Sequence, residues 1–322
     1  MTRSHANSAL VTAICLVALC APPGDAAMAQ TSDLPEEALP RAQALIRDRN
    51  YTIGSTPHFR VHSDDPRLDT KKTAELLESF RQYFEADWAA FPGRKTDDAP
   101  AQFFLFYSRF KYSQLGGPQF RETGVSAPGH YNTQADIVAI HTDTVDVGNL
   151  PDLLIHETTH QLTHITLLGP GTYGSPWLME GLAEYYGNMK RSPKEGFQPE
   201  RFGDKGVALF RDGPKSGPQI RSDELRQYKK ELSKGIAAPV EVLVNMRDPG
   251  QFLSDGLLQR YTASWMLVHF LMQGEGGRHR EGFARYIAQE AAGVSGATAL
   301  YEALGIDAAA LQTAFEDHVK HL

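Results

Sequence analysis

The stretch HETTH, residues 156–160, is the most informative segment of this sequence. His156 and His160 lie four residues apart, so on one helix their imidazoles face the same point in space, as a shared metal ion requires. Glu157 lies about 100° around the helix from His156, which lets its carboxylate reach a water molecule at that point without binding the metal. The pentapeptide alone also fits an amphipathic helix that packs two histidines, so a second signal is needed.

A second segment supplies a third candidate ligand. Residues 177–186 read WLMEGLAEYY and carry Glu180 and Glu184 four residues apart on one helix face. A catalytic zinc ion usually takes three protein ligands, so Glu180 would complete a set with His156 and His160. Glu184 would accept the free ring N–H of one histidine and fix its tautomer. Two solvated surface glutamates are the alternative, but they fit poorly with so many apolar neighbours.

Between residues 150 and 190 the chain resembles the gluzincin metallopeptidases, which include thermolysin and the aminopeptidase-N branch, and it is most similar to bacterial peptidase-MA-like proteins. The resemblance rests on an HExxH helix followed, after 19 intervening residues, by a glutamate in a Trp-Leu-x-Glu-Gly-x-Ala-Glu-Tyr segment. It implies a general base at Glu157, a supporting carboxylate at Glu184 and zinc ligands at His156, His160 and Glu180.

A weaker similarity lies at Tyr261-Thr262-Ala263-Ser264. In the aminopeptidase branch a Tyr-x-x-Gly helix carries a tyrosine that stabilises the oxyanion, so the resemblance implies this role for Tyr261, although Ser264 replaces the glycine. The alternative is an ordinary core stripe of Tyr261 with Trp265, Val268 and Met272. The chain has no Gly-x-Met-Glu-Asn segment of the kind that anchors a free N-terminus, so exopeptidase activity is not supported.

Other histidines are expected to be structural. His164 lies eight residues from His156, about 12 Å along a helix, which is too far for one ion to bind both. We therefore expect His164 to pack or to support a ligand. His130 and His141 lie near the presumed substrate edge of the sheet, and for both a structural role is favoured. The metzincin pattern HExxHxxGxxH is excluded, because Thr163 and Thr166 stand at its Gly and His positions.

The hydrophobic periodicity predicts an α+β, zincin-like fold with a small mixed sheet and the HExxH helix in a front lobe, and a helical C-terminal lobe. Strands are expected over 58–62, 102–107 and 136–141, with an edge strand at 129–132 and a helix over 71–91. Further helices are expected over 150–168, 176–187, 222–234, 256–273, 279–291 and 307–321.

The same patterns predict the domain organisation. A linker or N-terminal arm over 30–50 is followed by one zincin-like metallopeptidase domain over 51–322. That domain divides into an α/β lobe over 51–168 and a helical lobe over 169–322. Its length is sufficient for one large core with a cleft.

The first 29 residues read as an export signal. Arg3 precedes an apolar run, and Ala27-Met28-Ala29 matches a small-x-small cleavage site. Cys15 and Cys20, the only cysteines, lie inside it. Lipidation of Cys20 is a lesser alternative, because bulky Leu19 precedes it. No later run reaches the roughly 20 apolar residues that span a bilayer, so we expect a periplasmic or secreted protein without stable membrane insertion after signal cleavage.

The charge of the chain limits the kinds of binding partner that we expect. The net charge of −7 does not favour nucleic acid. We expect an exported zinc-dependent peptidase that hydrolyses peptide bonds in a peptide or protein substrate, through a zinc-activated water with Glu157 as general base. The alternative is a non-catalytic zinc-containing binding or assembly module, which the intact Glu157 disfavours. Hydrolysis of a cell-wall amide is a third reading, and the oligomeric state leaves no signal in the sequence.

Overall fold

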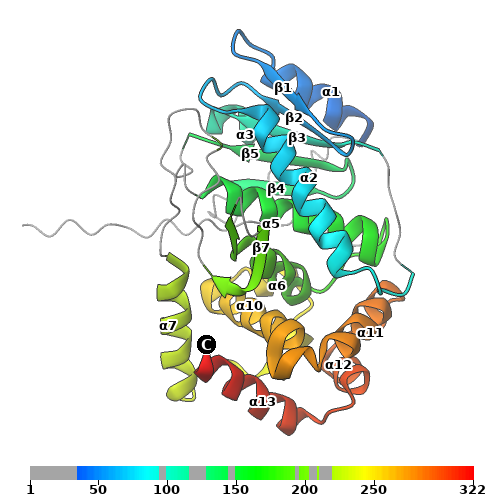
Figure 1. Cartoon of the computed structure of the whole chain (residues 1–322), viewed down its shortest axis with the longest axis vertical. Coiled ribbons are helices and arrows are strands. Elements are labelled where there is room, and N and C mark those ends of the chain that lie inside the picture. The colour runs from blue at the N-terminus through cyan, green and yellow to red at the C-terminus, as the bar shows by residue number, and fades with distance from the viewer. Residues whose placement is uncertain are drawn as a thin grey trace, which may run out of the picture.

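The protein is a helix-rich α/β structure with a five-stranded mixed sheet. A computed structural model describes residues 35–93, 99–115, 128–143, 149–192, 196–202, 209 and 220–322, so the expected export signal lies outside the described residues. Figure 1 shows the sheet and its helices at one end of the molecule and the C-terminal helices at the other. The zone between them holds the helices of the expected metal site.

The sheet has the strand order β1-β2-β3-β5-β4. Strands β2, β3 and β5 are parallel, and β1 and β4 pair antiparallel at the two edges. The expected strands are therefore present, including the edge strand at 129–132, and β1 is an addition. The strands are β1 Thr52–Ser55, β2 Phe59–Ser63, β3 Ala101–Phe106, β4 Gly129–Asn132 and β5 Ile137–His141.

Helices cover both faces of this sheet. Along β3, Phe103 and Leu105 point to the main core, while Phe104 and Phe106 point to a smaller cluster on the other face. Helices α2 and α5 share the main core, and α1 and α3 share the smaller cluster. The helices are α1 Pro35–Ile46, α2 Thr70–Asp87, α3 Arg109–Leu115 and α5 Leu150–Leu162.

Helix α1 forms within the segment expected as a linker or arm. Its Ala38, Ala42 and Ile46 are buried beside Phe104 of β3 and Tyr112 of α3. Residues 35–46 therefore pack on the sheet as part of the fold.

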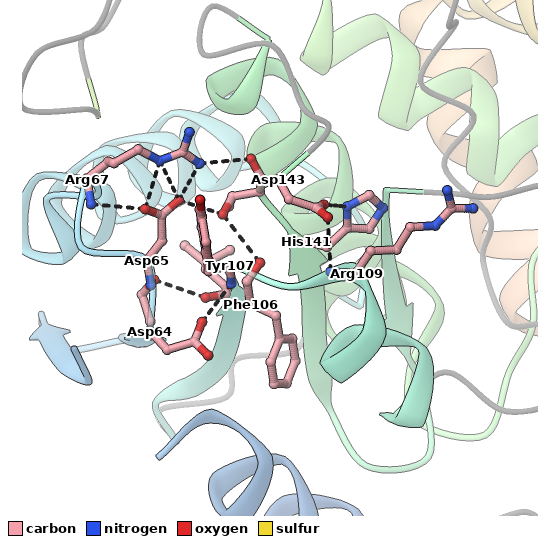
Figure 2. Close-up of polar contacts among 11 residues, drawn as sticks. Asp64, Asp65, Arg67, Phe106, Tyr107, Arg109, His141 and Asp143 are labelled. Atoms are coloured by element: carbon pink, nitrogen blue, oxygen red, sulfur yellow. Dashed lines mark hydrogen bonds and ion pairs between the residues drawn. The ribbon is translucent and has the colours of Figure 1, made fainter. Parts of the chain in front are cut away.

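A polar network joins the carboxyl ends of the three parallel strands (Figure 2). Asp65, just after β2, accepts three hydrogen bonds from the Arg67 guanidinium. It also accepts one at 2.6 Å from the hydroxyl of Thr142, which follows β5. The backbone N–H of Tyr107, after β3, donates to Asp64 at 2.6 Å. These bonds fix the strand ends relative to one another.

The C-terminal half is helical around α6, which packs along α10. Gly181 permits their close approach, since a Cβ there would stand 2.7 Å from the Ser264 carbonyl oxygen. The elements are η1 Thr163–Leu168, α6 Pro176–Gly187, β6 Met189–Ser192, β7 Gly196–Phe202, α7 Ile220–Ser233, α8 Val240–Asn245, α9 Pro249–Phe252, α10 Leu257–Gln273, η2 Gly274–Gly277, α11 Arg280–Ala291, α12 Ala297–Leu304 and α13 Ala308–His321.

All five helices expected over residues 169–322 are present, with ends that differ from the expected ones by two residues at most. One cluster of buried side chains continues from Val61 in the sheet to Val319 in the last helix. The two expected lobes therefore share one hydrophobic core.

None of the helices in the described ranges is both long enough and apolar enough to cross a membrane.

Candidate metal centre

The helix α5 carries the HExxH residues through the interior. Every residue from Leu150 to Leu162 except Asp152 is buried. Thr158 and Thr159 satisfy their hydroxyls on carbonyl oxygens one turn back, at 2.6 and 2.7 Å. The helix continues as the π-helical turn η1 and stops at Gly169, whose φ of 93° favours glycine. The expected helix over 150–168 thus ends at the expected glycine.

Three side chains converge between α5 and α6. The Nε2 atoms of His156 and His160 lie 3.0 Å apart. The Oε2 atom of Glu180 lies 3.5 Å from the first and 3.7 Å from the second. All three residues are buried, and this buried group could hold a metal ion. It joins the three residues that the sequence singled out as ligands.

The spacing of the donor atoms fits a single ion. A four-coordinate ion bound at about 2.1 Å separates any two of its donor atoms by about 3.4 Å. The three separations here, 3.0, 3.5 and 3.7 Å, bracket that distance. The donor set of two imidazoles and one carboxylate suits zinc and other first-row transition ions.

Burial sets the charge states of this group. Desolvation first, and then the neighbouring His156, keep the pKa of His160 well below its usual range. His160 is therefore neutral at neutral pH, which is the form that binds a metal. Desolvation raises the pKa of Glu180, against hydrogen bonds from His156 and Tyr261 that lower it. A carboxylate buried in this way is stabilised by a cation beside it.

Glu184 lies beside the candidate ligand His156. Its Oε1 atom is 3.3 Å from Nδ1 of His156, the ring nitrogen that faces away from Glu180. Its other oxygen accepts a 2.9 Å hydrogen bond from the Asn188 side chain. The sequence did not predict this contact, although Asn188 lies one helical turn after Glu184. Together the two side chains fix the orientation of the His156 ring.

The carboxylate of Glu157 is fully buried against the edge strand β4. A Cβ added to Gly129 would stand 3.1 Å from Oε1 of Glu157 and 3.0 Å from the Ile140 side chain. Only a residue without a side chain fits at this point of the strand without moving Glu157. The sequence places Gly129 in the expected edge strand but does not predict its contact with Glu157, which lies 28 residues away.

Tyr261 reaches the site from α10. Its hydroxyl donates a hydrogen bond to Glu180. The residue is also buried and packs against Phe252, with ring centroids 5.7 Å apart and ring planes inclined by 49°. Tyr261 can therefore be both a core residue and a residue of the site, the two interpretations that the sequence left open, because its side chain packs in the core and also contacts the candidate ligand Glu180.

A distant carboxylate positions the helix that carries Glu180. Glu290 of α11 is buried and accepts hydrogen bonds from the Ser175 backbone N–H at 2.9 Å, the Ser175 hydroxyl at 2.6 Å and the Tyr286 hydroxyl at 2.5 Å. Ser175 is the residue from which α6 begins. This anchor spans 115 residues of sequence, and no local pattern predicts it.

The remaining histidines have other surroundings. His130 lies on the far face of the sheet, with Nδ1 3.0 Å from the Tyr112 hydroxyl. His141 pairs with Asp143 at 2.7 Å. His164 is buried one turn beyond His160, with Nδ1 3.0 Å from the Tyr131 hydroxyl. His164 is therefore a packed residue, as expected, and Tyr131, its hydrogen-bond partner, belongs to the edge strand β4.

A scan of the sequence against protein-family models finds no match. A search of curated proteins likewise finds no significant relative.

Proposed function

We propose that this protein is an exported, zincin-like metallopeptidase of the gluzincin type, with zinc held by His156, His160 and Glu180. The observation that carries the proposal is the buried convergence of the three donor atoms from two helices. A metal site built for structure alone needs no further acid, yet Glu157, the residue next to His156 in the sequence, is also fully buried. Export is proposed from the signal-like residues 1–29, and a peptide or protein is the proposed substrate.

Bound zinc would lower the pKa of a water molecule towards about 7 and polarise the scissile carbonyl. The rest of the chemistry belongs to the chain. Glu157 would take a proton from the attacking water and deliver it to the leaving amine. Tyr261, whose hydroxyl donates to Glu180 in this structure, would turn that hydrogen to the oxygen that becomes negative during attack.

Strand β4 is suited to hold the substrate. Among the described strands it is the last of the sheet, and it pairs with β5 on one side only. Its Gly129 lies directly against Glu157. An extended peptide that adds to the other side of β4 would bring its backbone past the general base.

The substitution Glu157→Gln tests the proposal, because it keeps the shape of the side chain and removes its basicity. Zinc content and melting temperature should hardly change, while chelator-sensitive peptide cleavage should fall by about 100 to 10,000-fold. Rates are measured with a broad peptide library on paired preparations, and zinc re-addition after chelation serves as the control. Equal rates would assign the activity to another residue or a contaminant, and a wild-type chain that cleaves no peptide would favour a binding module.

A further inference from the structure

A chain of hydrogen bonds runs from Asp136 through Tyr131 to the His164 ring, where one ring nitrogen has no partner among the described residues. Asp136, in the turn between β4 and β5, accepts from the Tyr131 hydroxyl at 3.0 Å and from the Gln161 side chain at 2.9 Å. The Tyr131 hydroxyl lies 3.0 Å from Nδ1 of His164. Because the tyrosine proton is given to Asp136, the tyrosine oxygen must accept from the ring, so Nδ1 of His164 carries the hydrogen.

This arrangement leaves the other ring nitrogen as an acceptor. Burial lowers the pKa of His164, so the ring is neutral near pH 7 and Nε2 holds a lone pair. His164 is only 5% exposed, and among the described residues Nε2 has no hydrogen-bond partner. A buried acceptor without a donor is costly, and such an atom is usually completed by a ligand or water.

The place of His164 relates it to a bound peptide. Tyr131 stands two residues after Gly129 on β4, about 7 Å along the strand. Along β4, Gly129 lies next to Glu157, and Tyr131 contacts His164. A peptide extended along β4 would therefore bring the residue two positions from the scissile bond to His164.

The other side of the His164 ring borders the surface. The ring stacks on Tyr173 with centroids 6.5 Å apart and planes inclined by 17°. Tyr173 is 39% exposed and belongs to the connection that leads into α6. Movement of this one exposed ring would open the space beside His164 to a side chain from outside.

We propose that Nε2 of His164 is a specificity determinant, which accepts a hydrogen bond from a substrate side chain two positions from the cleaved bond. The side chain it selects carries a hydroxyl, amide or ammonium donor. The inference rests on the proposed peptidase function, and it assigns to that function a substrate class.

Matched peptides test it. Pairs that differ only in Ser against Ala, placed two residues before or after the cleaved bond, are compared by kcat/KM. The wild type should prefer the Ser peptide of one pair by about tenfold, the effect of one buried hydrogen bond. His164→Asn, whose amide reaches only the Nδ1 position, should abolish the preference, so that the kcat/KM values of the two peptides differ by less than about twofold. His164→Gln, whose amide reaches the Nε2 position, should retain part of it.

A binding measurement separates this inference from the peptidase proposal. The same peptides, fluorescently labelled, are titrated into Glu157→Gln protein and into its double variant with His164→Asn. A preference in Kd that the second substitution removes supports the role of His164 even without turnover. If variants at 164 do not fold, ¹⁵N NMR of histidine-labelled Glu157→Gln protein should show His164 as the Nδ1–H tautomer, with an Nε2 signal shifted by the Ser peptide only.

The outcomes distinguish the two proposals. Cleavage or binding without a Ser preference on either side, or an unshifted Nε2 signal, would overturn the role of His164 and leave the peptidase proposal intact. A wild-type chain that neither binds nor cleaves any peptide would overturn both.

Discussion

Substitution of Glu290 by glutamine measures how strongly a remote carboxylate holds the helix of the candidate ligand Glu180. The change keeps the shape of the side chain, but one carboxylate oxygen becomes a donor. If that amide faces the Ser175 backbone N–H, two donors meet and the 2.9 Å bond is lost. A buried group left unpaired costs about 1–3 kcal/mol. The bonds from the Ser175 and Tyr286 hydroxyls also lose charge assistance, at about 0.5–1 kcal/mol each.

We therefore expect Glu290→Gln to lower the free energy of unfolding by about 3 kcal/mol, which corresponds to a fall in Tm of roughly 6–9 °C in a protein of this size. Calorimetry or circular dichroism measures the change. Glu281→Gln on the same helix is the control. Within the described part of the chain Glu281 makes only an exposed pair with Arg285, so this change should shift stability by less than about 0.5 kcal/mol. Equal melting of the two variants would refute the anchoring of α6 by Glu290.

Three other substitutions test the site and the sheet. Glu184→Gln should weaken zinc affinity by about 10 to 100-fold, since the His156 ring loses its carboxylate partner; a competitive chelator titration that shows no change would contradict this. Gly129→Ala should displace Glu157 by a few tenths of an ångström. Because about 1 Å of misplacement costs about 100-fold in rate, kcat should fall about 3 to 10-fold while zinc is retained. An unchanged kcat would show that the strand accommodates the methyl group without moving Glu157. His130→Gln should make the protein lose less stability in acid. Burial lowers the pKa of His130 from 6.5 to about 4, so as the pH falls the unfolded chain binds the proton before the folded chain does. About 3 kcal/mol of stability that is present above pH 6.5 is therefore lost in the wild type as the pH falls to about 4. Urea unfolding at pH 7 and pH 4 measures that difference, and equal differences in wild type and variant would exclude His130 as its source.

The parts of the site that depend on local spacing could be predicted from the sequence. His156 and His160 share a helix face by their spacing, and the same rule places Glu184 one turn from Glu180. The helical turns do converge as that rule requires. Their proposed roles in binding zinc and in catalysis remain predictions.

The parts that depend on distant pairs could not be predicted. Gly129 matters through its contact with Glu157, and Glu290 through its bonds to Ser175. No periodicity relates such pairs, because the chain brings them together only when the sheet and the helices pack. The hairpin β6–β7 was missed for another reason: its short strands lack an alternating apolar pattern.

The complete burial of α6 determines how its amide hydrogens exchange with solvent. All twelve of its residues are buried, whereas α7 and α13 each carry exposed residues. A helix with no solvent-facing side cannot fray without disturbing the core around it, so its amides exchange only when the whole core opens. Deuterium should therefore enter the backbone around Glu180 at the pace of global unfolding. These amides then report the stability of the entire protein in native buffer, without denaturant.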